Sequence, residues 1–124
     1  MPSDQSSPSQ QRRVFVVEDE IMIRMLLEDM LADLGYGVAA SAGGLDEAIT
    51  LARESDFDVA ILDVNLNGHA VYPVAEVLDQ RGVPFVFSTG YGERGLPEPY
   101  RNRPTLQKPF QLENLDKALA TVTR

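Results

Sequence analysis

Apolar residues along this chain follow two alternating patterns. Short runs of apolar residues, many of them β-branched or aromatic, are typical of strands buried on both faces; they occupy residues 14–17, 59–62 and 83–87, with a weaker candidate at 36–40. Each run is followed by apolar residues at the spacing of one helix face or by a break in the pattern. This alternation predicts a parallel sheet with helices packed on both sides.

Four amphipathic helices are predicted from that spacing. Their apolar faces carry, in chain order, Ile23, Leu26, Leu27, Met30, Leu31 and Leu34, then Leu45, Ala48, Ile49 and Ala52, then Val71, Val74, Ala75 and Leu78, and finally Leu112, Leu115, Leu119 and Val122. Gly35 and Gly82 are expected to end the first and third of these helices, where a left-handed residue is favoured. Pro73 is compatible with the third helix only in its first turn.

The alternation is interrupted between residues 90 and 104. Glycines and three prolines in this segment disfavour a long helix. Residues 105–107 then fit a short fifth strand. We therefore expect a doubly wound α/β sandwich with a five-stranded parallel sheet, in which the helix before the last strand is short or disordered.

Composition and charge limit the classes of function. A chain of 124 residues suits one domain, which we assign to residues 12–124. Residues 1–11, rich in Ser, Gln and Pro, are expected to form a disordered tail that lacks the apolar stretch of a secretion signal. The formal net charge of −8 would repel a phosphate backbone, so we expect no DNA binding.

Cysteine usage and hydropathy point to a location. The chain has no cysteine, which excludes disulfides and cysteine-ligated metal sites. No apolar run approaches membrane-spanning length, so no membrane insertion is expected. A reducing cytoplasm is the simplest setting for such a chain.

Polar residues gather where the predicted strands end. In a parallel sheet of this kind, ligands bind at the carboxyl ends of the strands. The residues found there are, in chain order, Glu18, Asp19, Asp63, Ser88, Thr89, Lys108 and Pro109. Three carboxylates, hydroxyl groups and an ammonium group are therefore predicted to meet at one edge of the sheet, although the hydrophobic pattern does not require them there.

These groups support one coherent chemistry. Clustered carboxylates repel each other, and Mg²⁺ (with Mn²⁺ as an alternative ion) removes that cost because it prefers carboxylates, waters and phosphate oxygens. One carboxylate can then attack phosphorus and become an acyl phosphate. Lys108 would neutralise the phosphoryl oxygens, Thr89 could bond one of them afterwards, and the backbone N–H groups of Asn65 and Gly90 could supply further donors.

The motifs at the strand ends resemble the receiver domains of bacterial response regulators. The resemblance rests on the pair Glu18–Asp19, the single Asp63, the pair Ser88–Thr89 and the pair Lys108–Pro109, and it covers nearly the whole chain. It implies a CheY-like, flavodoxin-like sheet of strand order 2-1-3-4-5. It also implies site roles: Asp63 as phosphoacceptor, Lys108 as phosphoryl contact, Thr89 as switch hydroxyl, and Glu18 (through water), Asp19, Asp63 and the Asn65 carbonyl as Mg²⁺ ligands.

The segment at residues 85–91, Phe-Val-Phe-Ser-Thr-Gly-Tyr, is similar to the F-A-T-G-Y subclass of receivers, in which the fourth helix is degraded. This resemblance implies a sensor histidine kinase of the HWE type as partner. The chain departs from the subclass at Ser88, where Ala is usual. It departs from the wider family at Leu106, where we expect Tyr or Phe, so a switch through a rotating aromatic at that position is not expected.

The resemblance implies a stand-alone response regulator of a two-component phosphorelay. It would accept a phosphoryl group from a histidine kinase or a histidine phosphotransfer protein and signal to a downstream protein by contact. The protein is expected to be a monomer or a weak dimer that depends on phosphorylation. It would assist its own phosphorylation and dephosphorylation without being a turnover enzyme.

The same residues argue against three other functions. An aspartyl-phosphate phosphatase usually places a second Asp two residues after the nucleophile, where this chain has Asn65. A flavin or nucleotide domain would need a glycine-rich loop after the first strand, where this chain has acidic residues. A phosphorylation-independent adaptor would not need the full set of site residues. His69 is interpreted as an exposed bystander.

Two physical expectations follow from the site and from the interrupted segment. Without metal, carboxylate repulsion should destabilise the site, so that Mg²⁺ or Asp63→Asn raises stability. Residues 91–103, flanked by Tyr91 and Tyr100, should become more ordered on activation, because their glycines and prolines favour low local stability.

Overall fold

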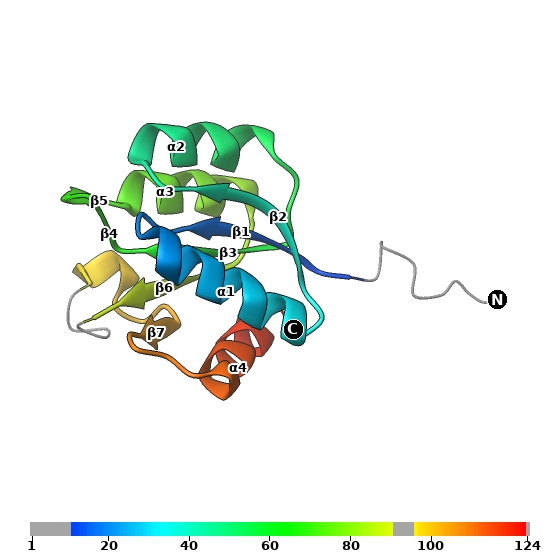
Figure 1. The fold of residues 1–124 in the computed structure, drawn as a ribbon. Coiled ribbons are helices and arrows are strands. Elements are labelled where there is room, and N and C mark those ends of the chain that lie inside the picture. The colour runs from blue at the N-terminus through cyan, green and yellow to red at the C-terminus, as the bar shows by residue number, and fades with distance from the viewer. Residues whose placement is uncertain (1–10, 91–95, 124) are drawn as a thin grey trace.

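The computed structural model describes residues 11–90 and 96–123, which form a parallel sheet covered by helices. Its elements, in chain order, are β1 (Arg13–Val17), α1 (Ile21–Asp33), β2 (Gly37–Ala42), α2 (Leu45–Glu54), β3 (Val59–Asp63), β4 (Asn65–Leu66), β5 (His69–Ala70), α3 (Tyr72–Arg81), β6 (Phe85–Thr89), the 3₁₀ helix η3 (Glu98–Tyr100), β7 (Thr105–Gln107) and α4 (Leu112–Thr123). The five-stranded sheet has the order β2-β1-β3-β6-β7, with every pair parallel (Figure 1). The predicted order 2-1-3-4-5 is confirmed.

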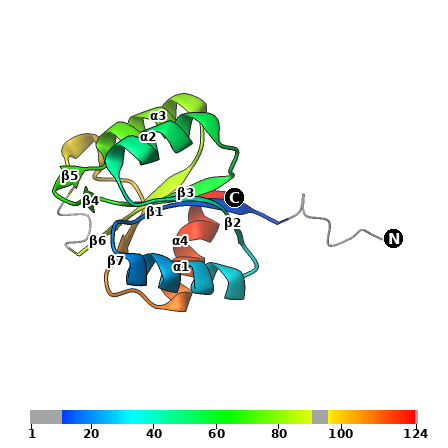
Figure 2. The same cartoon turned by 45° about the horizontal axis from the view of Figure 1, so that its top comes forward.

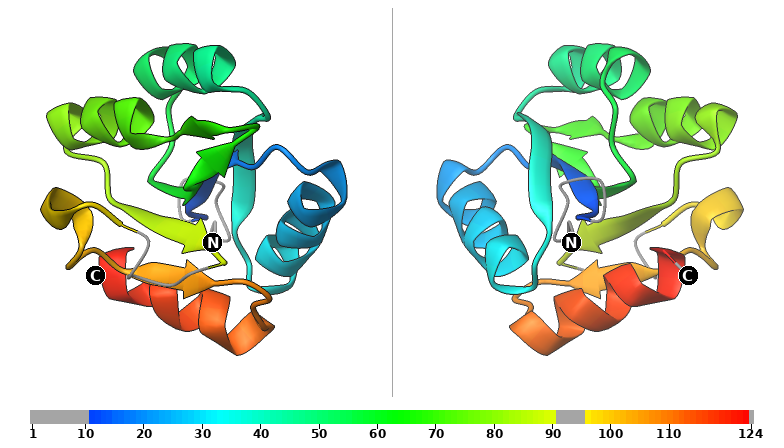
Figure 3. Two further views of the ribbon diagram at one scale, coloured as in Figure 1. Left: turned by 90° about the vertical axis from the view of Figure 1, so that its left-hand side faces the viewer. Right: turned by 90° about the vertical axis from the view of Figure 1, so that its right-hand side faces the viewer.

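Helices cover both faces of this sheet. α2 and α3 lie on one face and α1 and α4 on the other (Figure 2), and the end-on views show α2 and α3 side by side (Figure 3). Side chains alternate along β1 accordingly: Phe15 and Val17 join the core under α2 and α3, whereas Val14 and Val16 join the core under α1 and α4. The central strands are buried on both faces, which explains their uninterrupted apolar sequences.

The predicted ends of the helices are confirmed at two glycines and one proline. Gly35 and Gly82 have φ values of 88° and 72°, in the left-handed region that glycine adopts without a Cβ clash. Gly82 caps α3 directly, and Gly35 follows the last residue of α1 by two positions. Pro73 lies in the first turn of α3, where its missing N–H is not needed.

Some predicted details were wrong. Leu26 was placed on the buried face of α1 but is 49% exposed, because the helix rests on the sheet mainly through Leu27 and Leu31 and position 26 turns away from both. Leu112, also assigned to a buried face, is partly exposed at the first turn of α4. His69 is exposed as expected, but it belongs to the short strand β5, which pairs with β4.

The described part of the chain between β6 and β7 contains a short 3₁₀ helix. Leu96 is buried and η3 follows it, so the prediction of a short fourth helix is confirmed. The first part of the predicted switch segment, residues 91–95 with Tyr91, and most of the predicted tail, residues 1–10, lie outside the described residues. Among the described helices, none has the length and apolar character needed to cross a bilayer.

Candidate functional site

Strand register brings the predicted polar residues together. β1 and β3 pair Val17 with Leu62, so the next residues, Glu18 and Asp63, leave the sheet side by side. β3 and β6 pair Asp63 with Ser88. Glu18, Asp63 and Ser88 therefore form one cross-strand row at the carboxyl end of the sheet. Side-chain alternation places this row on the face covered by α1 and α4.

Lys108 bridges the two buried carboxylates of the row. Its Nζ lies 3.0 Å from Oε1 of Glu18 and 3.4 Å from Oδ1 of Asp63. Glu18 is fully buried and Asp63 is 6% exposed. An isolated buried carboxylate is costly, so this single ammonium group compensates two negative charges only in part.

Asp19 lies at the rim of the site, next to the first two carboxylates. One oxygen from each of Glu18, Asp19 and Asp63 lies within 4.8 Å of the others. Oδ2 of Asp19 also accepts a hydrogen bond of 3.0 Å from the backbone N–H of Asn67. Three hard oxygen ligands thus converge as the sequence predicted, with the most exposed of them held by a neighbouring turn.

That turn joins β4 to β5 and shapes the site. The backbone N–H of Asn65 points to Oδ1 of Asp63 at 3.4 Å, and Oδ1 of Asn65 accepts a bond of 2.7 Å from the N–H of Gly68. Asn67 and Gly68 have φ values of 53° and 87°, which suits an Asn-Gly pair in a tight hairpin. The sequence analysis missed Asn67 as a contact of Asp19, although the Asn-Gly pair was the signal that could have predicted this hairpin.

The charges in the site perturb its ionisation. Burial, followed by the nearby Glu18 charge, raises the pKa of Asp63 to about 7 despite the opposing Lys108. Burial opposes the charged form of Lys108, but its bond to Glu18 and the charge of Asp63 outweigh burial and raise the lysine pKa. Partial burial would raise the pKa of Asp19, yet hydrogen bonds, chiefly from the N–H of Asn67, lower it overall.

Thr89 and Gly90 complete the opening above Asp63. Thr89 is the last residue of β6, is 5% exposed, and its carbonyl accepts a bond of 2.9 Å from the N–H of Lys108. The strand was predicted to end before Ser88, so the structure extends it by two residues. A cavity of about 460 Å³ is lined by residues that include Asp19, Asp63, Asn65, Thr89, Gly90 and Lys108. The peptide bond between Lys108 and Pro109 is cis.

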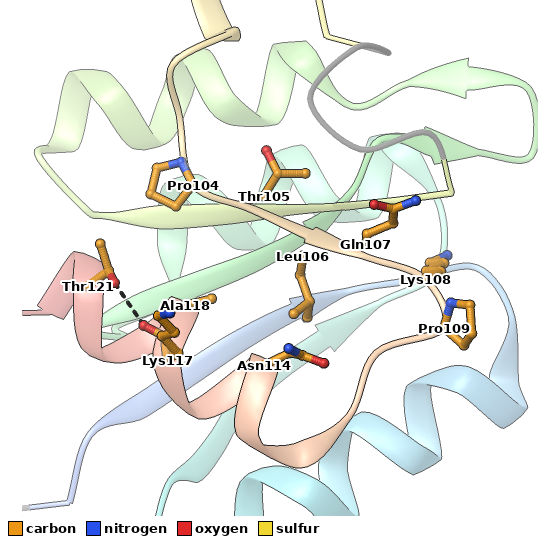
Figure 4. A pocket seen from close by; sticks show the side chains of 10 residues that line it. All are labelled: Pro104, Thr105, Leu106, Gln107, Lys108, Pro109, Asn114, Lys117, Ala118 and Thr121. Atoms are coloured by element: carbon orange, nitrogen blue, oxygen red, sulfur yellow. Dashed lines mark hydrogen bonds between the residues drawn. The ribbon is translucent and has the colours of Figure 1, made fainter.

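Leu106 proves not to be the residue that could couple to Thr89. Leu106 points from β7 toward α4 and packs in that core, whereas Thr105 points to the opposite side (Figure 4). Thr89 follows Phe87 by two residues and so shares the α3 side of the sheet with it. The position that faces the side of Thr89 is therefore Thr105, which is not aromatic either, so the expectation of no aromatic switch on this strand is unchanged.

A second groove lies outside the acidic site. It has a volume of about 590 Å³ and runs between β7 and α4, from Pro104 to Lys108 (Figure 4). Its lining is mixed, with Leu106 at the bottom and Asn114 and Lys117 on α4. Of the residues that line the acidic cavity, Lys108 also lines this groove.

Comparisons with known proteins agree with this fold. The sequence profile of the response regulator receiver domain matches residues 14–120. The chain is 33% identical over 122 residues to the transcriptional regulatory protein PdtaR of Mycobacterium tuberculosis, covering 95% of this chain and 60% of that protein. It is 26% identical to a probable chemotaxis protein CheY of Rhizobium etli, covering 89% of this chain and 91% of that protein.

Solved structures give the same result. The solution structure of SdrG from Sphingomonas melonis Fr1 is similar with a TM-score of 0.80 and 40% identity, covering 89% of this chain and 94% of that one. The receiver domain of the PhyR response regulator from Erythrobacter litoralis follows with a TM-score of 0.76 and 30% identity, covering 92% and 94% of the two chains. With the acidic row, the lysine and the sheet order in the places that the sequence predicted, the chain belongs to the response regulator receiver domain family.

Proposed function

We propose that this protein is a response regulator that accepts a phosphoryl group on Asp63. The observation that carries the proposal is the position of the Asp63 carboxylate. It lines a cavity of about 460 Å³, beside two further carboxylates and 3.4 Å from the Lys108 ammonium group. A carboxylate so placed can act as a nucleophile toward phosphorus, with positive charge nearby for the phosphoryl oxygens.

The donor set at this site fits Mg²⁺, with Mn²⁺ as an alternative. All three converging side chains offer hard oxygen ligands, and Oε1 of Glu18 is buried with no hydrogen bond of good geometry, although the Lys108 ammonium lies 3.0 Å away. Asp19, Asp63 and the Asn65 carbonyl would hold the ion directly and Glu18 through water. When bound, the ion supplies positive charge for the transferring phosphoryl oxygens.

The residues of this chain would divide the work of transfer. Asp63 forms the new O–P bond as the P–N bond of a phosphohistidine donor breaks, and the imidazole of the donor keeps the electron pair and takes up a proton. Lys108 moves from the carboxylates toward the phosphoryl oxygens. The hydroxyl of Thr89 and the N–H groups of Asn65 and Gly90 then bond those oxygens.

The same residues favour a signalling role over turnover. Asn65 lies two positions after Asp63 and its side-chain oxygen is held by Gly68. An amide cannot donate and accept a proton as a second carboxyl group could, so position 65 offers no general acid for fast hydrolysis. We therefore propose that the protein is not a turnover enzyme and that its acyl phosphate persists as a signal.

Protein partners are supported by the surface beside the site. The first two turns of α1 expose four large apolar side chains, Ile21, Met22, Met25 and Leu26, of which Met22 is 83% exposed. An apolar patch of this kind is typical of a protein contact surface. We propose a sensor histidine kinase, of the HWE type, or a histidine phosphotransfer protein as phosphodonor, and a separate protein as downstream target, all in the cytoplasm.

DNA binding is not proposed. PdtaR is named as a transcriptional regulatory protein, but this chain spans 60% of its length and carries a formal net charge of −8. Such a charge opposes contact with a phosphate backbone. The proposed state is a monomer, or a weak dimer that forms on phosphorylation.

The proposal is tested by phosphorylation with a small-molecule donor. The protein is incubated with acetyl phosphate and its intact mass is measured, with and without Mg²⁺. We expect the mass of one phosphoryl group, dependent on Mg²⁺ and lost in Asp63→Ala. Asp58→Ala, which changes an aspartate at the opposite end of β3, should keep the adduct. No adduct and no release of inorganic phosphate would instead favour a phosphorylation-independent adaptor.

A further inference from the structure

Ser88 is a buried hydroxyl residue that the proposed chemistry does not use. It is 1% exposed, it pairs in register with Asp63, and its Oγ has no hydrogen-bond partner among the described residues. Among the described residues, Glu18 Oε1 is the other buried side-chain atom without a hydrogen bond of good geometry, and it belongs to the same cross-strand row. Glu18 Oε1, however, lies 3.0 Å from the Lys108 ammonium group, whereas Ser88 Oγ has no such contact. Unsatisfied polar atoms of this kind are uncommon and call for a reason.

Alanine would suit this position better if only the unphosphorylated form mattered. The side chain faces the apolar core that contains Val86 and Leu106, its neighbours along β6 and across to β7. A buried hydroxyl without a bond is less favourable than a methyl group in such surroundings. The hydroxyl is therefore expected to find its partner in another state of the domain.

Lys108 can supply that partner. The sheet order places β6 between β7 and β3, so the lysine side chain must cross β6 to reach Asp63 and Glu18. The residue of β6 that lies in register with Asp63 is Ser88. An ammonium group has three N–H donors, and the two carboxylate contacts leave one for a further acceptor.

The phosphoryl group changes where the ammonium must sit. In the unphosphorylated domain, Nζ of Lys108 lies 3.4 Å from Asp63 and 3.0 Å from Glu18. Once Asp63 is an acyl phosphate, negative charge shifts outward to the phosphoryl oxygens, and Nζ is drawn away from the buried Glu18. The lysine stem then swings over β6, where Oγ of Ser88 is the remaining acceptor of the row.

We propose that Ser88 is a positioning residue whose hydroxyl accepts a hydrogen bond from Lys108 only in the phosphorylated domain. The bond fixes the ammonium against the phosphoryl oxygens. In the unphosphorylated domain the same hydroxyl lacks a partner and costs stability. Ser88 thereby favours the phosphorylated state in two ways: it destabilises the unphosphorylated domain and stabilises the phosphorylated one. This inference rests on the proposed phosphorylation of Asp63.

The test compares Ser88→Ala with the wild-type protein in two measurements. The first is binding of beryllium fluoride, a phosphoryl mimic, in the presence of Mg²⁺, followed by calorimetry. We expect the Kd of Ser88→Ala to rise about three- to tenfold, as for the loss of one hydrogen bond to a charged group. The second is the urea midpoint of the protein without phosphoryl mimic, which should stay unchanged or rise.

Ser41→Ala is the matched control. The Ser41 hydroxyl donates a bond of 2.9 Å to Oε2 of Glu28, away from the site. This variant should lower the urea midpoint and leave the Kd for beryllium fluoride unchanged.

Two results would overturn the inference. If Ser88→Ala lowers the urea midpoint, or binds beryllium fluoride as tightly as the wild type does, Ser88 has an ordinary structural role. If the wild-type protein itself fails to bind beryllium fluoride and takes no phosphoryl group from acetyl phosphate, the proposed function fails and this inference fails with it.

Discussion

Among the described residues, Lys108 is the one cation that contacts both Glu18 and Asp63, at 3.0 Å and 3.4 Å. Its loss should therefore leave a fully buried carboxylate without compensation. We predict that Lys108→Met lowers the free energy of unfolding of the metal-free protein by about 3 kcal/mol, in the range observed when one partner of a buried pair is removed. Urea unfolding measures this difference.

Lys117 provides the control for that change. It is the other lysine of the chain and is exposed on α4. Lys117→Met should change the free energy of unfolding by less than about 0.5 kcal/mol. Equal effects of the two substitutions would contradict a special role of the buried contact.

Asp63 should make the metal-free protein sensitive to pH. Its pKa is raised to about 7, first by burial and then by the Glu18 charge, so the fold favours the protonated carboxyl group. The contribution of this carboxyl group to the free energy of unfolding is fully present below the pKa of the unfolded chain, about 3.9. It is lost as the pH rises through the folded pKa, because the folded protein must then hold a buried charge. Between pH 5 and pH 8 the free energy of unfolding should fall by about 1 kcal/mol, a value reduced by the solvent that reaches the site.

Asp63→Asn should remove this dependence and raise stability at pH 8. The raised pKa of Lys108 does not contribute in this window, because that group stays charged in both states. Chemical unfolding of both proteins in the presence of a chelator checks the prediction. The same slope with pH in Asp63→Asn would show that Asp63 is not the titrating group.

The individual site residues were predictable because strand ends in a parallel sheet share one edge. That rule alone placed Glu18, Asp63 and Lys108 together. The contact of Asn67 with Asp19 was missed, because it depends on a hairpin that follows β3 and was not predicted as such. The missing partner of Ser88 also lay beyond sequence reasoning, since it depends on the register of three strands.

At the scale of elements, η3 is held by a cluster of rings and one cation. Tyr100 stacks on Tyr72 of α3 with ring centroids 5.3 Å apart and meets Phe87 of β6 edge to face at 5.4 Å. Arg103 bonds both carboxylate oxygens of Asp79, at 2.9 Å and 3.0 Å, and lies over the ring of Phe85. Residues 96–103 are thus docked on α3 and β6 before any activation.

We predict that Arg103→Gln loosens this docking. The substitution removes the ion pair in which Nη2 of Arg103 contacts both oxygens of Asp79, and a cation–π contact with Phe85. Together these are worth about 1 kcal/mol at a partly exposed site. Amide exchange in residues 98–101 should become about fivefold faster, as measured by hydrogen–deuterium exchange with mass spectrometry. Arg101→Gln, at an exposed arginine of the same segment, should leave the exchange unchanged. No difference between the two variants would rule out Arg103 as the anchor.

The same measurement tests the predicted switch. If phosphorylation orders the segment from residue 91 to residue 103, its amide exchange should slow when beryllium fluoride and Mg²⁺ are added. Because residues 96–103 are already packed, we expect only a small change in that part of the segment. Unchanged exchange throughout would contradict the prediction.

The hydrophobic pattern predicted which helices and strands exist, but it predicted their first and last residues less accurately. The residues of β7 were predicted without error, whereas β6 was placed two residues early because Ser88 and Thr89 are polar although they are buried in the strand. Leu26 was misplaced because helical spacing gives the width of an apolar face but not which part of it meets the sheet. Tertiary packing decides both.

At the scale of the whole molecule, the acidic site links metal binding to the stability of the fold. Glu18 and Asp19 follow β1, and Asp63 ends β3. β3 is the central strand in the order β2-β1-β3-β6-β7, and β1 is its neighbour. An ion bound there stabilises the native state against the unfolded chain. We predict that Mg²⁺ at ten times its Kd adds about 1.4 kcal/mol to the free energy of unfolding.

A thermal melt with increasing Mg²⁺ measures this gain. Asp19→Asn should weaken it strongly while changing the metal-free protein little, since Asp19 is the least buried of the three carboxylates. Asp46→Asn, which removes an acidic group from the first turn of α2, should retain the full stabilisation by Mg²⁺. A wild-type melt that does not respond to Mg²⁺ would mean that the carboxylates do not form a metal site.

The central claim, that Asp63 carries the phosphoryl group, is tested most directly by locating the modification. The protein is treated with acetyl phosphate and Mg²⁺, reduced with borohydride to convert an aspartyl phosphate to homoserine, and sequenced by peptide mass spectrometry. The account predicts homoserine at position 63 and at no other aspartate. Conversion at Asp19, or phosphate found only on a serine, threonine or histidine, would contradict it.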